Sequence, residues 1–123
     1  LLQYDKNWNF INVKELVDID KQSIGMVSGI YLSDKSLVMH SRTNVNAYGR
    51  GKMPPPPTPG KLTDDGGNIA RYLFNSDGQL ISTEYLYEGT NAHRPHTALL
   101  NDLLITTWDG GKDGTTLRID KIQ

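Results

Sequence analysis

Two histidines stand three residues apart in the most polar stretch of the chain, Asn91-Ala92-His93-Arg94-Pro95-His96. On a helix this spacing would let both imidazoles share a metal ion. Pro95 argues against a helix interior, and an extended chain would turn His93 and His96 to opposite faces. A metal site needs a further ligand, and the remaining histidine, His40, has no evident relation to this pair. We therefore predict no metal site, with one histidine packed against a strand and the other solvated.

A second candidate for chemistry is the glycine-rich loop that follows Trp108, because it carries two carboxylates four residues apart. An EF-hand calcium loop places oxygen ligands at its positions 1, 3 and 5, a glycine at 6 and a glutamate at 12. Asp109, Asp113 and Gly114 would fill positions 1, 5 and 6. Position 3 is Gly111, which offers no side-chain ligand, and position 12 is not a glutamate. The pattern therefore favours a plain turn over a calcium site.

Aromatic and charged residues of the same region suit a carbohydrate pocket. In such pockets aromatic rings stack on the apolar faces of sugars, and charged groups bind the hydroxyls. The alternative for Trp108, which stands at the end of an apolar run, is packing in the core. The candidate ligand-binding residues are Trp108, Asp109, Arg94, His93, Tyr85 and Tyr87.

No motif in the chain is specific enough to name a reaction. Fourteen acidic residues could include a glycosidase pair, but nothing singles out two of them. Phosphate-binding, nucleophile-elbow and metalloprotease motifs do not occur, and the lack of cysteine removes thiol catalysis and cysteine-bound zinc. We predict no catalytic residue and no cofactor, and we favour a protein that is not an enzyme.

Charge and hydropathy limit the partners. Thirteen basic residues against fourteen acidic ones give a net charge of −1, without a basic stripe, which argues against nucleic acid. No apolar run approaches the roughly 20 residues of a membrane helix, so no membrane insertion is expected. The chain starts Leu1-Leu2 without methionine, as a mature product or a piece of a longer chain would.

The elements that must position these residues are short strands separated by turns. Asn75-Ser76-Asp77-Gly78 predicts a hairpin turn, because Asp and Gly tolerate positive φ. Residues 83–88 alternate, which predicts a strand with Tyr85 and Tyr87 on one face. Residues 97–104 have apolar spacing compatible with a helix, but we expect strand, turn and strand there.

The two halves of the chain resemble each other. Tyr4 aligns with Tyr72 and Leu37 with Leu104, at offsets of 68 and 67 residues. Ordered matches with nearly constant offsets are typical of a repeat whose short loops vary in length.

A proline-rich segment separates the halves and holds five of the six prolines. Prolines donate no backbone hydrogen bond and favour polyproline II, so this segment cannot lie inside a sheet. It reads as a solvated linker or, alternatively, as an arm that docks in an aromatic groove of a partner. The predicted organisation is a first blade-like repeat at residues 1–52, a linker loop at 53–67 and a second repeat at 68–123.

The second half carries three phrases in order: Tyr72 to Asp77-Gly78, then Pro95 to Ala98-Leu99, then a hydrophobic strand that ends Thr107-Trp108-Asp109-Gly110. Over residues 68–120 this resembles the β-propeller blade repeats of large bacterial extracellular and surface proteins. The first half matches loosely, with Ser41 in the place of Trp108.

This resemblance implies an all-β fold of two blade-like four-stranded antiparallel meanders, with a β-sandwich as the alternative. It also implies an extracellular or cell-surface location. Propellers have about four to eight blades, so two need self-association or the remainder of a longer chain. The expected function is a non-catalytic binding or structural module of a propeller-like or self-assembling protein, with glycans as the candidate ligand. The alternative is part of a propeller glycoside hydrolase, because propellers host both binding and catalysis.

Overall fold

A computed structural model describes residues 1–16, 22–45, 68–88, 92–110 and 114–122. Within these ranges the chain is all-β, as predicted, and no residue is helical. No described segment is therefore a helix that could cross a membrane. The strands are β1 (Leu2–Tyr4), β2 (Phe10–Val13), β3 (Gln22–Tyr31), β4 (Leu37–Val45), β5 (Asn68–Phe74), β6 (Leu80–Tyr87), β7 (Ala92–Leu100), β8 (Leu103–Gly110) and β9 (Thr116–Lys121).

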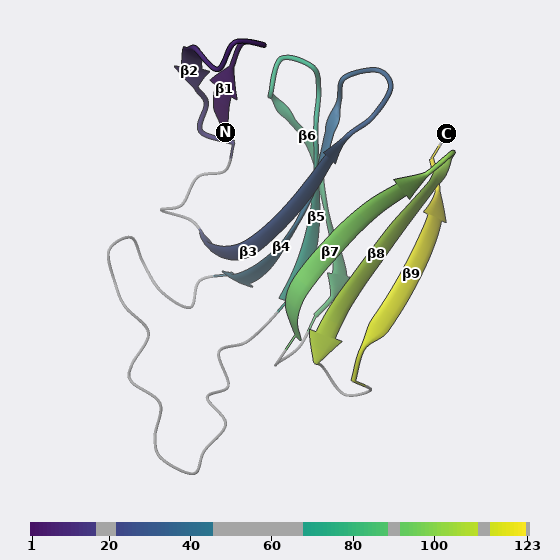
Figure 1. Ribbon diagram of the computed structural model, residues 1–123. Coiled ribbons are helices and arrows are strands. Elements are labelled where there is room, and N and C mark those ends of the chain that lie inside the picture. Colours follow the sequence, from purple (N-terminus) through teal and green to yellow (C-terminus); the bar gives the residue numbers. More distant parts are fainter. Residues whose placement is uncertain (17–21, 46–67, 89–91, 111–113, 123) are drawn as a thin grey trace.

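These strands form three antiparallel sheets (Figure 1). They are the N-terminal hairpin β1-β2, the four-stranded sheet β3-β4-β5-β6 and the three-stranded sheet β7-β8-β9. β4 pairs with β5 from Leu37↔Phe74 to Thr43↔Asn68. The four-stranded sheet thus takes two strands from each half of the chain, whereas one meander was expected from each half. The pairing is favourable because it sets apolar side chains of β4 and β5 side by side on one face.

The three-stranded sheet packs face to face on the four-stranded sheet, with β7 against β3, β4 and β5 (Figure 1). The core has two parts. Between the sheets lie Ile69, Ala92 and Trp108, with Leu86 and Tyr87 packed against them. On the far face of the four-stranded sheet lie Leu37, Met39, Ala70, Tyr72 and Phe74, with Leu16 packed against them. Two packed sheets occur both in β-sandwiches and between propeller blades, and the described residues do not close into a ring.

Three hairpin turns share one construction: residues 5–9, 32–36 and 75–79. In each, the fourth residue donates its N–H to the first carbonyl, and the first residue donates to the fifth carbonyl, at 2.9–3.0 Å. This is a type I turn followed by a residue in the left-handed region. That residue is Trp8 (φ 65°), Lys35 (φ 66°) or Gly78 (φ 78°). Only the last of these turns has the residue type that this conformation favours.

These turns give a first testable prediction. Lys35→Gly should raise the free energy of unfolding by roughly 0.5–1 kcal/mol. It removes the strain of a left-handed lysine, and the greater conformational entropy of glycine in the unfolded chain offsets only part of this stabilisation. Gly78→Ala should lower the free energy of unfolding by about 1–2 kcal/mol, because alanine is strained at a φ of 78°. The added Cβ would also lie 3.1 Å from Lys14 Cδ. Denaturant midpoints of both variants measure the effects. Loss of stability in Lys35→Gly would contradict the turn assignment.

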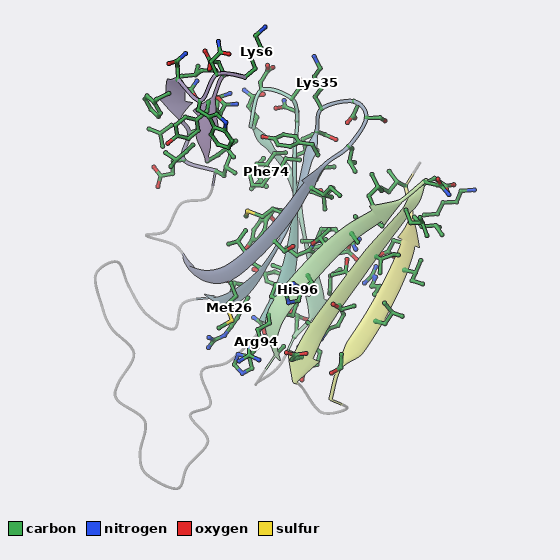
Figure 2. All side chains as sticks on the ribbon, viewed as in Figure 1. Lys6, Met26, Lys35, Phe74, Arg94 and His96 are labelled. Carbon is green, nitrogen blue, oxygen red and sulfur yellow. The ribbon has the colours of Figure 1, made fainter. Side chains whose placement is uncertain are left out.

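β3 and β7 each contain a bulge at which the register with the next strand shifts. A non-glycine residue with positive φ lies at each bulge: Met26 (54°) and Arg94 (48°). Figure 2 labels both residues, of which Met26 lies in the middle of β3 and Arg94 near the start of β7. They stand 68 residues apart, whereas the turns of residues 5–9 and 75–79 correspond at an offset of 70 residues, so the structure aligns Tyr4 with Phe74 and not, as expected from the sequence, with Tyr72.

Candidate functional site

One polar residue from each strand of the four-stranded sheet contributes to a continuous row. Ser28 pairs with His40, His40 with Arg71, and Arg71 with Glu84. Directly opposed residues of antiparallel strands share a face. Since Arg71 and His40 contact residues of the three-stranded sheet, the whole row faces that sheet.

The three-stranded sheet has a second polar row, which faces the first. Thr97 pairs with Thr106, and Thr106 with Arg118. Asp120 lies two residues further along β9 and therefore on the same face. The backbone N–H of Thr97 donates to Ser28 Oγ across the gap, at 3.0 Å. We call these two facing rows the inter-sheet network.

His40 is the buried centre of the network and has no exposed surface. Arg71 Nε lies 2.8 Å from His40 Nε2, and a guanidinium can only donate, so Nε2 accepts. Nδ1 therefore carries the proton and donates to Thr97 Oγ1 at 2.8 Å. Thr106 Oγ1 lies 3.3 Å from Nε2 and can donate to it as well. All polar atoms of the ring are thus satisfied in its neutral form.

The surroundings of His40 hold it neutral. Burial lowers its pKa to about 4, assisted by the positive charge of Arg71 and, less strongly, Arg118. The carboxylate of Asp120 opposes the shift without cancelling it. At neutral pH the ring is uncharged, and both its nitrogens are occupied. It cannot act as a general base without breaking the bonds that join the sheets.

Four charged groups complete the network toward the β6 and β9 edge. Arg71 donates to Asp120 Oδ2 at 2.6 Å and to Glu84 Oε2 at 3.3 Å. Arg118 binds the same two carboxylates, Glu84 at 2.9 Å and Asp120 at 3.0 Å. Burial would raise the pKa of Asp120, but the hydrogen bonds from Arg71 and Arg118 outweigh it and lower this pKa below the usual value. The quartet is electrically neutral.

The structure brings together three of the six residues that the sequence offered as a ligand site. His93 lies directly opposite Asp109 in the β7–β8 ladder. Arg94 Nη1 lies 3.7 Å from Asp109 Oδ2, and both side chains are more than half exposed. These residues form a polar patch at one end of the three-stranded sheet.

The relation of the two neighbouring histidines was predicted wrongly. His93 pairs with Asp109 and His96 with Thr107, two residues apart on β8, so both histidines share a face. The bulge in β7 adds one residue between His93 and His96, so their side chains lie on the same face although they are three residues apart. A positive φ at an arginine has no sequence signature, so simple alternation misjudged the faces.

Trp108 does not line the polar patch. It is only 4% exposed and packs with Ile69 and Ala92 between the sheets. Tyr87 packs against the same cluster. The ring of Trp108 is therefore covered and has no free face on which a sugar could stack, which matches the core alternative.

The two tyrosines of β6 point to opposite faces, contrary to the alternation expected for residues 83–88. Tyr87 lies opposite Ile69, which faces the three-stranded sheet, whereas Tyr85 lies opposite Ala70 on the far face. The register shifts between these pairs, so the intervening Leu86 is a bulge. Tyr85 and Tyr87 cannot serve one pocket.

Two earlier candidates fall outside the described ranges: Asp113 of the possible calcium loop and the linker at 53–67. Among the residues that the structure describes, no group of three or more His, Asp or Glu side chains could hold a metal ion.

Sequence reasoning missed the inter-sheet network. His40 carried the one available signal, since it follows the apolar run Leu37-Val38-Met39 on a strand. A histidine in such a position is either exposed on the other face or buried with partners. Its partners Arg71, Thr97 and Thr106 lie 31, 57 and 66 residues away in the chain, and only the pairing and packing of the strands bring them together.

No family model, curated protein or solved structure matches this chain.

Proposed function

We propose that the chain is a non-catalytic binding or structural module of an extracellular propeller-like or self-assembling protein. The observation that carries this proposal is the closed inter-sheet network. Its two carboxylates are bound by two guanidiniums, and its histidine is neutral and fully hydrogen-bonded. Groups engaged in this way join two sheets and are not poised for reaction. The extracellular setting rests on the resemblance to surface-protein blades.

The finer architecture that we propose is a series of blades. β3–β6 would form one complete blade, β7–β9 three strands of the next, and β1–β2 the outer hairpin of the preceding one. The turns of residues 5–9 and 75–79 support this division, because in both of them, but not in residues 32–36, the first side chain accepts from the third and fifth backbone N–H groups. The bulges at Met26 and Arg94 support it independently. The blade boundaries would then differ from the linker-based division of the sequence.

The alternative, a propeller glycoside hydrolase, has less support. Its general acid must stay protonated near neutral pH and so needs a raised pKa. Asp120 has a lowered pKa, and Glu84 is bound by both arginines. Neither carboxylate meets that requirement. A glycan site would instead use the exposed patch of His93, Arg94 and Asp109.

A glycan array and a hydrolysis screen with the same sugars test the proposal. We expect no turnover, and loss of at least about tenfold in any glycan affinity on Asp109→Asn, a change of about 1.4 kcal/mol. Asp102→Asn is the matched control, because Asp102 is an exposed carboxylate paired with Lys121, away from the patch. Hydrolysis that Glu84→Gln or Asp120→Asn abolishes, with the fold intact, would contradict the proposal.

A further inference from the structure

The three-stranded sheet carries a cluster of apolar side chains on its outer face. Its inner face contacts the four-stranded sheet, so the alternate residues of each strand point away from that contact. Leu100, Leu117 and Ile119 are 58%, 62% and 55% exposed. Contiguous apolar surface of this kind is uncommon on monomers and marks interaction sites. The apolar residues of this outer face are Ala98, Leu100, Leu103, Ile105, Leu117 and Ile119, and the polar residues His96, Thr107 and Lys121 flank them on the same face.

The N-terminal hairpin has a second bare apolar face. Leu2 pairs with Val13, and Tyr4 pairs with Phe10, whose ring meets that of Tyr4 edge-on at 5.9 Å. The four side chains are between 46% and 65% exposed. In Figure 1 this hairpin and the three-stranded sheet lie on opposite sides of the four-stranded sheet.

The chain itself shows the hairpin face in a covered form. In the turns of residues 5–9 and 75–79, unlike that of residues 32–36, the side chain of the first residue also accepts from the backbone N–H groups of the third and fifth residues, and this shared turn aligns Leu2 with Tyr72 and Tyr4 with Phe74. Tyr72 and Phe74 have no exposed surface and belong to the far-face cluster of the four-stranded sheet. The equivalent positions are thus buried in the β5–β6 hairpin and exposed in the β1–β2 hairpin.

The outer face also has a covered counterpart. The bulges of β3 and β7 align Thr107 with His40 and Ile105 with Val38. His40 and Val38 are 0% and 4% exposed, on the face that the three-stranded sheet covers. The three-stranded sheet covers it with its own inner face. On that inner face Leu104 aligns with Leu37, which belongs to the far-face cluster of the four-stranded sheet.

We propose that the N-terminal hairpin of one chain docks by its bare face on the outer face of the three-stranded sheet of a second copy. The inference rests on the proposed blade architecture, because the packing of the two large sheets is its template. In that packing, the inner face of the three-stranded sheet, which corresponds to the far face of the four-stranded sheet, covers the face of the four-stranded sheet that corresponds to the outer face. The hairpin face also corresponds to the far face, and the three-stranded sheet offers the outer face itself. Such a contact is heterologous, so it continues head to tail into a ring or a filament.

Two substitutions block the two faces separately. Ile119→Lys places a charge on the outer face, and Val13→Glu places one on the hairpin face. Both side chains are more than half exposed, so the chain should still fold, which circular dichroism checks. Ile81→Lys, on β6 at 59% exposure and on neither face, is the control.

Sedimentation velocity at rising concentration gives the readout. The native chain and the Ile81→Lys control should associate, whereas Ile119→Lys and Val13→Glu alone should stay monomeric, with affinity reduced at least about tenfold. An equimolar mixture of the two blocked variants should form a 1:1 dimer and nothing larger, because one native face remains on each chain.

Three results would overturn this interface. They are a native chain that stays monomeric to about 1 mM, a weak-binding limit; a blocked variant that still self-associates like the native chain; and a mixture that forms no dimer. A monomeric native chain would leave the hydrolysis and glycan results untouched, so failure of the interface and failure of the non-catalytic proposal are distinguishable.

Discussion

Replacing Arg71 by methionine is expected to lower the free energy of unfolding by roughly 3 kcal/mol. The Arg71 side chain is only 14% exposed and donates to His40, Glu84 and Asp120 at once. Methionine has a similar length but cannot donate, so it leaves the partly buried carboxylate of Asp120 short of a cation. Losing one partner of a buried charged network costs more than losing an exposed pair. Denaturant unfolding measures the loss.

Arg118→Met is the matched control for this prediction. Arg118 binds the same two carboxylates but is 36% exposed and does not contact His40. Its loss should lower the free energy of unfolding by about 1 kcal/mol or less, as for exposed pairs. Adding Asp120→Asn to Arg71→Met should recover part of the stability, because it removes the excess negative charge that two carboxylates leave beside Arg118 alone. Equal losses for the two arginines would contradict the central place of Arg71.

Acidification from pH 6.5 to pH 4 is expected to remove about 3 kcal/mol of stability through His40 alone. Its pKa falls from 6.5 in the unfolded chain to about 4 in the folded one. As the pH falls through this window, the unfolded chain takes up a proton and the folded chain does not. The contribution is therefore fully present above pH 6.5 and is lost as the pH approaches 4. The lowered pKa of Asp120 acts below 3.8, outside the window.

Two variants isolate this contribution. His40→Gln keeps hydrogen-bonding capacity without titration, and His40→Leu removes both. Each should fold with lower stability at pH 7, yet with a flatter dependence on pH between 6.5 and 4 than the native chain. Urea unfolding across this range gives the comparison. A native slope no steeper than that of both variants would rule out a buried neutral histidine.

The sequence predicted the strands well where turns and alternation are local. Asn75 to Gly78 is a turn between β5 and β6, and residues 97–104 form strand, turn and strand as expected. These features depend on residues next to one another. An apolar alternation and a turn-forming pair suffice to predict them, whatever the rest of the chain does.

Features that depend on register could not be predicted in the same way. The bulges at Arg94 and Leu86 change which side chains share a face. Neither contains a glycine, the residue from which a bulge could have been predicted in the sequence. The network joins His40, Arg71 and Asp120 through three different strands. His40 and Arg71 come together because β4 pairs with β5, and Asp120 joins them because the three-stranded sheet packs on the four-stranded one; no local pattern encodes either contact.

The titration of His40 followed by nuclear magnetic resonance tests the central claim most directly, namely that a buried polar row joins the two sheets. Long-range ¹H–¹⁵N spectra report the tautomer and the protonation of each ring nitrogen. The structure predicts a proton on Nδ1, an unprotonated Nε2, and a pKa of about 4. A proton on Nε2 at neutral pH, or a midpoint at the ordinary value of 6.5, would contradict the packed network and the account built on it.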